Sequence, residues 1–301
     1  MLEALTFKIA PGMEGFRLDG FLRRMLPDLP AKSVRFAIDG GEVFVGREKG
    51  AKGRILRKGE EVAIRRIAEA ADWLPVPGDL PGAGLLYADA DVAVISKPVN
   101  VHTVPQRPLE EGTLAGYLRL RYPDTARMSM DPGLTLLTRL DYATSGAVPA
   151  AVTADAYAFL AREREKGRIV KTYLCLVSGS MEREMSLSFL LDPSGGEKVR
   201  VRIDRNEPDP LYWTDVRPIR AVGESTLVRA VISKGKRHQI RAHLAAAGFP
   251  IVGDRRYGTV PADGPGKDRL MLHAVEVRFT HPANGQAVSV SAPLPGEFGV
   301  I

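Results

Sequence analysis

Near the start of the chain, apolar residues recur at helical spacing. These residues are Leu18, Phe21, Leu22 and Met25, which would form an apolar stripe along one face of a helix. It predicts one amphipathic helix, which Pro27 ends. A second short helix is expected over 31–38, and short apolar runs at 43–45 and 61–64 predict two strands. Residues 1–66 are therefore expected to form a small α+β domain.

After this domain the pattern changes to many short apolar runs. Residues 67–83 contain Pro75, Pro77 and Pro81, and they are expected to be a linker. Helices are predicted over 113–121, 154–166 and 237–247. Strands are predicted over 85–87, 92–95, 134–140, 147–152, 169–177, 198–203, 212–219, 226–232, 271–280 and 287–292. So many strands with so few helices favour an α+β fold with a mixed, mainly antiparallel sheet over 84–301.

The composition is typical of a globular protein, with 45% hydrophobic and 26% charged residues among 301. No apolar run is long enough to span a bilayer, and the N-terminus lacks the basic flank and long apolar core of a signal peptide. The single cysteine, Cys175, excludes an internal disulfide framework. We therefore expect a protein of the reducing cytoplasm, without membrane contact.

Positive charge is concentrated in two parts of the chain. Residues 14–66 contain 13 Lys and Arg against 8 Asp and Glu, an excess of 5, and residues 229–256 contain 7 against 1, an excess of 6. Because the whole chain carries a net charge of only +6, the remainder is net negative. Clustering of this kind predicts surfaces that face a polyanion, for which nucleic acid is the leading candidate.

The first domain resembles the S4 RNA-binding domain. The matching positions are Arg17-Leu18-Asp19, Phe21-Leu22, Ser33, Ile38, Gly41, Val43, Val45, Gly59 and Val62. The resemblance implies RNA binding. Basic residues on or beside the two predicted helices are the candidates for it: Arg17, Arg23, Arg24, Lys32 and Arg35. The alternative is a small α+β domain whose basic face is only solvated.

The stretch 136–146 combines an apolar lead-in with a charged pair and a turn. The lead-in is followed by Arg139 and Asp141, and then by the small polar residues Thr144 and Ser145. A carboxylate beside a tight turn at the end of a strand is one way to hold a reactive group on a rigid element. On this stretch alone, the simpler interpretation is an Asp141 side chain that caps its own turn.

Two further segments place reactive side chains together. Lys171 and Tyr173 would face the same way on a strand, where the tyrosine ring can stack on a ligand or simply lie at a sheet edge. On the predicted helix 237–247, Arg241 borders the apolar stripe, one turn after Arg237. A guanidinium there needs a carboxylate or phosphate partner, unless its stem packs on the core and its head stays in water.

Taken together, five ordered motifs resemble the RluA-type pseudouridine synthases. They are Arg139-Leu140-Asp141-x-x-Thr144-Ser145-Gly146, Lys171-x-Tyr173, Arg237-His238-Gln239-Ile240-Arg241-x-His243-Leu244, Gly253-Asp254-x-x-Tyr257-Gly258 and Leu272-His273-Ala274. The stretch from Leu86 to Pro98 is similar to the family's opening hairpin, and the likeness covers residues 84–295. It implies the pseudouridine synthase fold and the isomerisation of specific uridines in structured RNA.

The resemblance also implies roles for individual residues. Asp141 would be the nucleophile, Arg241 its partner, and Tyr173 a catalytic ring that stacks on the flipped uracil. A carboxylate nucleophile must be ionised, which a neighbouring arginine favours. Arg139 would hold the nucleotide in its extruded position, and Leu272 would form the floor of the uracil pocket. The other residues expected to bind the substrate are Lys171, Arg237 and His238.

The resemblance implies neither a metal nor an organic cofactor. His238 and His243, five residues apart, are also poorly spaced as metal ligands on one helical face. The expected partner is RNA, with large-subunit ribosomal RNA favoured by the S4-like domain and transfer RNA second, and a monomer is expected. The chain departs from the family at Thr138, Ser96 and Asn100, where histidine, asparagine and glycine are usual.

Two other functions are compatible with parts of this pattern. One is a non-catalytic RNA-binding or ribosome-assembly factor that keeps the fold. Retention of Asp141, Tyr173 and Arg241 together argues against it, because binding alone does not need a carboxylate of this kind. The other is a hydrolase such as a glycosidase, which needs two acidic residues at its site, whereas Asp141 alone stands out.

Overall fold

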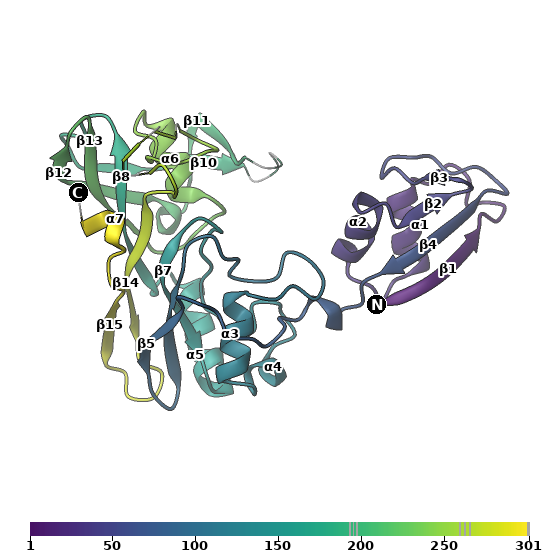
Figure 1. Ribbon diagram of the computed structural model, residues 1–301, viewed down its shortest axis with the longest axis horizontal. Coiled ribbons are helices and arrows are strands. Elements are labelled where there is room, and N and C mark those ends of the chain that lie inside the picture. Colours follow the sequence, from purple (N-terminus) through teal and green to yellow (C-terminus); the bar gives the residue numbers. More distant parts are fainter. Residues whose placement is uncertain are drawn as a thin grey trace. The chain divides into compact units, whose positions relative to one another are not determined.

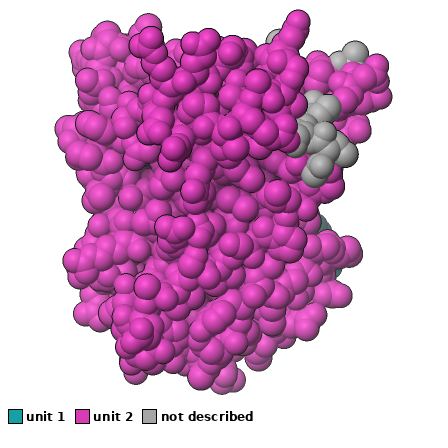
Figure 2. Space-filling model, turned by 90° about the vertical axis from the view of Figure 1, so that its left-hand side faces the viewer, with its two compact units in different colours: residues 1–76, 105–111 teal, residues 77–104, 112–301 magenta. Residues whose placement is uncertain are grey.

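The computed structural model describes residues 1–192, 194, 196, 198–258, 260–261, 263–264 and 266–299. The chain forms two compact units, Met1–Val76 with Pro105–Glu111, and Pro77–Val104 with Gly112–Ile301 (Figure 1). Figure 2 shows one face of the second unit. Among the described residues, no helix is both long and apolar enough to cross a bilayer. The last two residues of the predicted catalytic domain, 300–301, lie outside the described residues.

The first unit contains a four-stranded antiparallel sheet and two helices (Figure 1). Its elements are β1 (Leu2–Lys8), α1 (Leu18–Met25), α2 (Ala31–Asp39), β2 (Val43–Val45), β3 (Glu48–Lys49), β4 (Glu61–Ile67) and the 3-10 turn η1 (Ala71–Trp73). The predicted stripe buries Leu18, Phe21 and Leu22 in the core of this unit. In the predicted linker, Trp73 donates from Nε1 to Ser33 Oγ (2.8 Å), which fixes η1 to α2. A small α+β domain of this kind is consistent with the S4 resemblance.

The second unit contains a nine-stranded sheet with the order β5-β6-β7-β14-β8-β13-β12-β9, and β15 pairs with β14. The strands of this sheet are β5 (Gly84–Ala88), β6 (Val92–Lys97), β7 (Ser145–Ala151), β8 (Val170–Ser178), β9 (Met185–Leu187), β12 (Thr214–Val222), β13 (Ser225–Ile232), β14 (Leu272–Thr280) and β15 (Ala287–Ser291). The pair β10 (Phe189–Asp192) and β11 (Arg200–Asn206) forms a separate hairpin. The helices are α3 (Leu114–Arg121), α4 (Thr125–Met128), α5 (Ala154–Glu165), η2 (Pro210–Tyr212), α6 (Gln239–Ala246) and α7 (Gly296–Gly299). The predicted mixed, mainly antiparallel sheet is present.

Both faces of the central strands are buried, which explains their continuous apolar runs. On β6 and β7, Ile95 and Val148 belong to a core cluster that also contains residues of α3 and α6. Val94 and Ala147, their neighbours in sequence, belong to a second cluster that includes α5. Alternate residues of one strand therefore pack on opposite layers of helices, and β7 and β14, which are interior strands of the sheet, lie between these layers.

The predicted strand over 134–140 is wrong. Leu136 and Leu137 are buried as expected, but they make only a single bridge to Ala150 and one backbone bond to Pro149 on β7. Leu134 has a left-handed backbone (φ 51°), which breaks an extended run. The strand of this region is β7, which begins after the turn, so the charged pair of the central stretch stands on a loop.

The predicted helix 237–247 begins later than expected, at Gln239. His238 occupies its N-cap position with a left-handed backbone (φ 56°), and Arg237 therefore lies before the helix. The predicted strand 198–203 is displaced to β11, and its partner β10 was not predicted. The strands β1, β3 and β9 were not predicted either, while the other predicted helices and strands follow one another in the expected order.

The turn after Asp141 is fixed by the pairing of β7 with β14. The two strands run parallel here, with Ser145 opposite His273 and Gly146 opposite Ala274. Gly146 has φ 125°, and a Cβ atom on it would lie 2.6 Å from the Ala274 nitrogen and closer still to its carbonyl oxygen. Only glycine allows this approach, so the glycine of the central motif is a packing requirement.

A buried lysine holds the other side of the same turn. Lys97, at the end of β6, is fully buried and donates from Nζ to the carbonyl oxygens of Pro98 (2.8 Å), Tyr142 (3.3 Å) and Thr144 (2.8 Å). Burial lowers its pKa to about 7, although Asp141 acts in the opposite direction. The ammonium thus gathers three backbone carbonyls around the turn that carries Asp141.

Replacing Gly146 by alanine should destabilise the second unit by about 3 kcal/mol or more, because the methyl group collides with backbone and not with a movable side chain. Urea denaturation measures the change. Gly84→Ala on β5 is the matched control, since no atom lies within 4 Å of its new Cβ, and it should shift the free energy of unfolding by less than about 1 kcal/mol. Equal stability of both variants would contradict the close approach.

The low pKa of Lys97 makes stability depend on pH. Between about pH 7 and pH 10 the unfolded chain binds a proton that folded Lys97 has released, so the free energy of unfolding should rise across this range. In Lys97→Met, the free energy of unfolding should rise less over this range, by on the order of a few kcal/mol, because the titrating amine is absent. Denaturant titrations at several pH values measure it, with the exposed Lys198→Met as control. Parallel curves for wild type and Lys97→Met would contradict the prediction.

Candidate active site

The loop before β7 presents the Asp141 carboxylate while its backbone is held on both sides. Thr103 Oγ1 donates to the Leu140 carbonyl (2.7 Å) and accepts from the Leu140 amide (3.1 Å). After Asp141, the Thr144 amide donates to the Asp141 carbonyl (3.0 Å). The turn is thus closed by the backbone of Asp141, not by its side chain as the simpler interpretation supposed. The carboxylate is free to meet other groups.

One guanidinium joins two carboxylates from distant parts of the chain. Arg241 on α6 donates from Nη1 to Asp141 Oδ2 (2.9 Å). It also donates from Nε and Nη2 to Asp254 Oδ2 and Oδ1, both at 2.8 Å. The Arg241 side chain is 8% exposed, Asp254 is 0% exposed and Asp141 is 26% exposed. The predicted partnership of Asp141 with Arg241 is therefore present in the structure, and Asp254 completes it.

The charges of this group are mutually stabilised. Burial alone would lower the pKa of Arg241, but the hydrogen bonds and charges of Asp254 and Asp141 raise it above its usual value. Burial alone would likewise raise the pKa of Asp254, but Arg241 and two backbone amides hold it below its usual value. The arginine and its buried carboxylate therefore stay charged across the physiological range.

His238 and Tyr257 form the next layer beside Asp141. His238 Nε2 lies 4.0 Å from Asp141 Oδ2, and its Nδ1 lies 3.0 Å from the Tyr257 hydroxyl. Burial lowers the pKa of His238, more than Asp141 raises it. The imidazole is therefore neutral at neutral pH, and the left-handed backbone at His238 aims it at the carboxylate.

Tyr173 lies on β8, next to the strand that carries Leu272. Leu272 pairs with Cys175 and Ala274 pairs with Tyr173 across the two strands, and both predicted site residues are buried. Burial, and after it the charge of Asp141, raise the pKa of Tyr173 well above its usual value. The tyrosine therefore offers a protonated, flat ring near the carboxylate.

The other predicted substrate residues lie around this centre in different ways. Arg139 is exposed, two residues before Asp141. Lys171 is buried and donates to the Ser233 carbonyl, and burial followed by the charge of Arg164 lowers its pKa to about 8. Arg237 donates to the Gly196 carbonyl (2.6 Å) at the β10–β11 hairpin. Lys171 and Tyr173 were expected to face the same way, because they are two residues apart on one strand. This arrangement does not bring the Lys171 ammonium to Asp141.

One of the departures from the family pattern, Asn100, fits its backbone position. Asn100, where glycine is usual, has φ 58°, and asparagine is one of the few other residues that adopt this conformation readily. Val101 next to it donates from its amide to the Tyr142 carbonyl (3.2 Å), so the loop after Pro98 reaches the Asp141 turn. Thr138 Oγ1 is buried without a hydrogen-bond partner among the described residues.

Sequence reasoning assigned no role to Lys97, Asp254 and Tyr257. Each stands in a motif that was recognised, but its partners come from elsewhere in the chain. The Lys97 acceptors are 1 to 47 residues away, and Asp254 is 13 residues from Arg241. The one local signal for such a role is at Lys97, a charged residue at the end of an apolar run, where burial requires hydrogen-bond partners.

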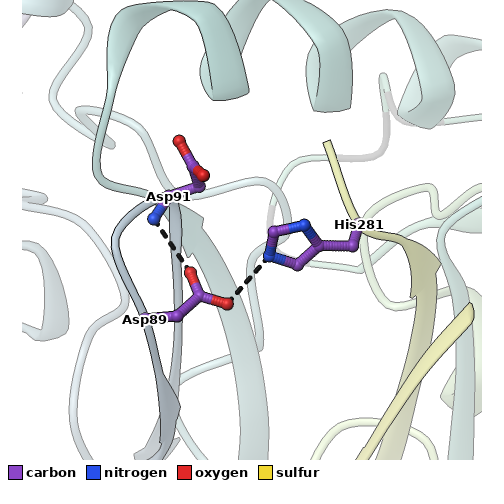
Figure 3. A group of neighbouring side chains, drawn as sticks. All are labelled: Asp89, Asp91 and His281. Atoms are coloured by element: carbon purple, nitrogen blue, oxygen red, sulfur yellow. Dashed lines mark hydrogen bonds and ion pairs between the residues drawn. The ribbon is translucent and has the colours of Figure 1, made fainter. Parts of the chain in front are cut away.

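A possible metal-binding group lies at the β5–β6 turn (Figure 3). Asp89, Asp91 and His281 bring potential ligand atoms within 4.8 Å of one another. Asp89 Oδ1 accepts from the amides of Asp91 and Val92 (both 2.8 Å), while Oδ2 accepts from Tyr87 Oη and lies 2.8 Å from His281 Nε2. Burial would raise the pKa of Asp89, but these bonds lower it. These hydrogen bonds give the group a structural role, because they join the β5–β6 turn to the residue that follows β14.

The predicted RNA-binding residues of the first unit are exposed on or beside α1 and α2: Arg17, Arg23, Arg24, Lys32 and Arg35. Arg24 lies over the ring of Phe16 (5.8 Å to its centre), and Lys32 Nζ lies over Trp73 (4.2 Å). Arg17 donates to Asp19 (3.1 Å). The helices of this unit therefore present five exposed cations, two of which lie over aromatic rings.

Comparison with known proteins bears on this site. Residues 91–246 match the family model described as RNA pseudouridylate synthase. The chain is 33% identical to the ribosomal large subunit pseudouridine synthase C of Salmonella typhimurium, over 95% of this chain and 92% of that protein. It is 27% identical to the ribosomal large subunit pseudouridine synthase D of Haemophilus ducreyi, over 98% and 92%.

A solved structure resembles this chain over most of its length. The human RNA pseudouridylate synthase domain containing 1 superposes with a TM-score of 0.54 at 26% identity, covering 73% of this chain and 86% of that one. The α+β fold class is thereby confirmed, and so is the family that the five motifs implied. The chain belongs to the RNA pseudouridine synthases.

Proposed function

We propose that this RNA pseudouridine synthase uses Asp141 as its nucleophile and acts on uridine in large-subunit ribosomal RNA. The observation that carries the first half is the Asp141–Arg241 contact at 2.9 Å, with the carboxylate a quarter exposed and the guanidinium buried. An ionised, partly accessible carboxylate held by a fixed cation is what a carboxylate nucleophile requires.

The chemistry is a balanced isomerisation. The Asp141 carboxylate attacks the ribose or the uracil ring, the bond between uracil N1 and the ribose carbon breaks, and the base turns. A bond then forms between uracil C5 and the same ribose carbon, C5 loses its proton, N1 gains one, and the carboxylate is released. Bonds and protons balance in this sequence of steps. Arg241 holds the carboxylate through its hydrogen bond to Oδ2, and the protonated ring of Tyr173 supports the base.

The target uridine must leave its stack to reach Asp141. The cost of unstacking is least for a base in a loop or an already unpaired region, so such uridines are the expected substrates. Arg139, exposed two residues before the carboxylate, is placed to occupy the space that the base vacates. Leu272, buried at the start of β14, is proposed to form the floor of the uracil pocket.

The choice of ribosomal RNA rests on two observations. The relatives named as large-subunit synthases C and D align over more than nine tenths of this chain, which includes the first unit. That unit presents basic side chains on a fold consistent with S4. Transfer RNA is the second candidate substrate, and the S4-like unit disfavours it.

Replacing Asp141 by asparagine keeps the shape and removes the nucleophile, so pseudouridine formation should fall by at least about 1,000-fold while RNA affinity stays within about twofold. Carbodiimide labelling of the pseudouridines in ribosomal RNA transcripts, followed by primer extension, measures the product, and filter binding measures the affinity. Asp155→Asn on the exposed start of α5 is the control for a lost negative charge. Turnover in Asp141→Asn would remove the nucleophile assignment. Wild-type protein that binds ribosomal RNA but modifies no uridine in it would favour an assembly factor.

The first unit is proposed to contact phosphates. Neutralising Arg23 and Arg35 together, as Arg23→Gln with Arg35→Gln, should weaken RNA binding and reduce the slope of log affinity against log salt by about 1 to 2, because fewer counterions are released. Arg66→Gln on β4, where the arginine pairs with Glu3, is the control and should leave the slope unchanged. An unchanged slope in the double variant would mean that these helices do not touch RNA.

A further inference from the structure

The turn over 253–258 is a rigid platform beside the proposed nucleophile. Just before it, Ile251 bridges to Val177 on β8, and the Val252 amide donates to the Leu176 carbonyl (2.9 Å). Gly253 has φ 79°, and a Cβ atom there would lie 2.6 Å from the Gly266 carbonyl oxygen and closer still to that of Arg269. The turn is thus locked against β8, the strand that carries Tyr173, and cannot shift independently of the site.

Asp254 on this turn fixes the plane of Arg241. Its carboxylate accepts two bonds from the guanidinium and two from the backbone amides of Arg256 (2.9 Å) and Tyr257 (3.1 Å). Bidentate pairing leaves the guanidinium one orientation, in which Nη1 points at Asp141. Because Asp254 also compensates the charge of Arg241, Asp141 receives a directed hydrogen bond without facing a full uncompensated cation.

The Tyr257 hydroxyl lies beside His238 Nδ1 and bears on which nitrogen of the ring carries the proton. The Tyr257 hydroxyl oxygen accepts from the Val199 amide (2.8 Å), so its own hydrogen is available for His238 Nδ1 at 3.0 Å. An Nδ1 that accepts leaves the proton of a neutral imidazole on Nε2. That nitrogen is the one that faces Asp141 Oδ2 at 4.0 Å. A second N–H donor is thereby aimed at the same carboxylate oxygen.

We propose that Asp254 and Tyr257 are positioning residues for the reaction. Asp254 orients Arg241, Tyr257 sets the tautomer of His238, and the locked turn between them places both donors around Asp141. The inference rests on the proposed role of Asp141 and deepens it. One short turn thus sets both the geometry and the charge around the nucleophile, which explains why Asp254 and Tyr257 stand in the same motif.

The first test removes one hydroxyl. Tyr257→Phe keeps the ring and should reduce kcat about tenfold with KM unchanged, because His238 loses the bond that sets its tautomer. Nitrogen-15 NMR of labelled histidines reads this tautomer without reference to activity. The His238 signals, assigned by their absence in His238→Asn, should show the Nε2-protonated form in wild type and a mixture of tautomers in Tyr257→Phe. Tyr157→Phe on α5 is the matched control and should change neither reading.

The second test changes charge but not shape. In Asp254→Asn, Arg241 loses its compensating partner and its fixed plane, so kcat should fall about 100-fold with little change in KM. Asp254→Glu, which keeps the carboxylate, should recover part of the lost kcat, whereas a loss caused only by poorer folding would not depend on the charge of this side chain. Asp268→Asn, an exposed aspartate in the same region, is the control.

The outcomes separate this inference from the proposed function. Turnover in Asp141→Asn removes the nucleophile assignment, while the NMR reading still decides whether Tyr257 sets the His238 tautomer. If Asp141→Asn is inactive but both Tyr257→Phe and Asp254→Asn keep wild-type kcat, the positioning role is overturned. A wild-type His238 protonated on Nδ1 overturns the Tyr257 half. If Asp254→Asn fails to fold, Tyr257→Phe and its NMR spectrum decide the inference.

Discussion

A buried guanidinium that needs two carboxylates is the constraint on which this site depends. Moving a charge out of water costs several kcal/mol, and Arg241 repays that cost only with partners in good geometry. Its partners, Asp141 and Asp254, lie 100 residues before and 13 residues after it in the sequence. The chain must therefore bring together the loop before β7, helix α6 and the turn over 253–258 before the charge is satisfied. Assembly of the site and stability of the unit are one requirement.

The same loop is also fixed from behind by cations and by backbone packing. Lys97 gathers three carbonyls around the turn, and Arg269 donates from Nη2 to Ser145 Oγ (2.7 Å), whose hydroxyl meets His273 Nδ1 (2.8 Å). Burial, and then repulsion by Arg269, lower the pKa of Lys97. Positive groups thus stand on the protein side of the turn, and Gly146 lets it approach β14. The positive charges of Lys97 and Arg269 favour a negative charge on this turn.

What the sequence predicts well is what local spacing determines. The stripe from Leu18 to Met25 and the pattern over 154–166 predicted helices close to those observed, because helical periodicity is contained in a few neighbouring residues. The partnership of Asp141 with Arg241 followed from motifs in order. The strand over 134–140 and the start of α6 failed because Leu134 and His238 adopt left-handed conformations that leave no mark in the side-chain pattern. The roles of Lys97 and Asp254 could not be predicted, since they depend on partners that only the tertiary fold supplies.

Two carboxylates face one guanidinium, and burial decides which of them is reactive. Asp254 is fully buried, and its oxygens accept four N–H groups, so it has no access to a substrate. Asp141 is a quarter exposed, and one N–H of Arg241 contacts it closely. Burial shifts the pKa values of Tyr173 and His238 in opposite directions, and both shifts favour the neutral form. The accessible negative charge of the site is therefore carried by Asp141, which is why one aspartate of the pair is proposed to react and the other to hold the arginine.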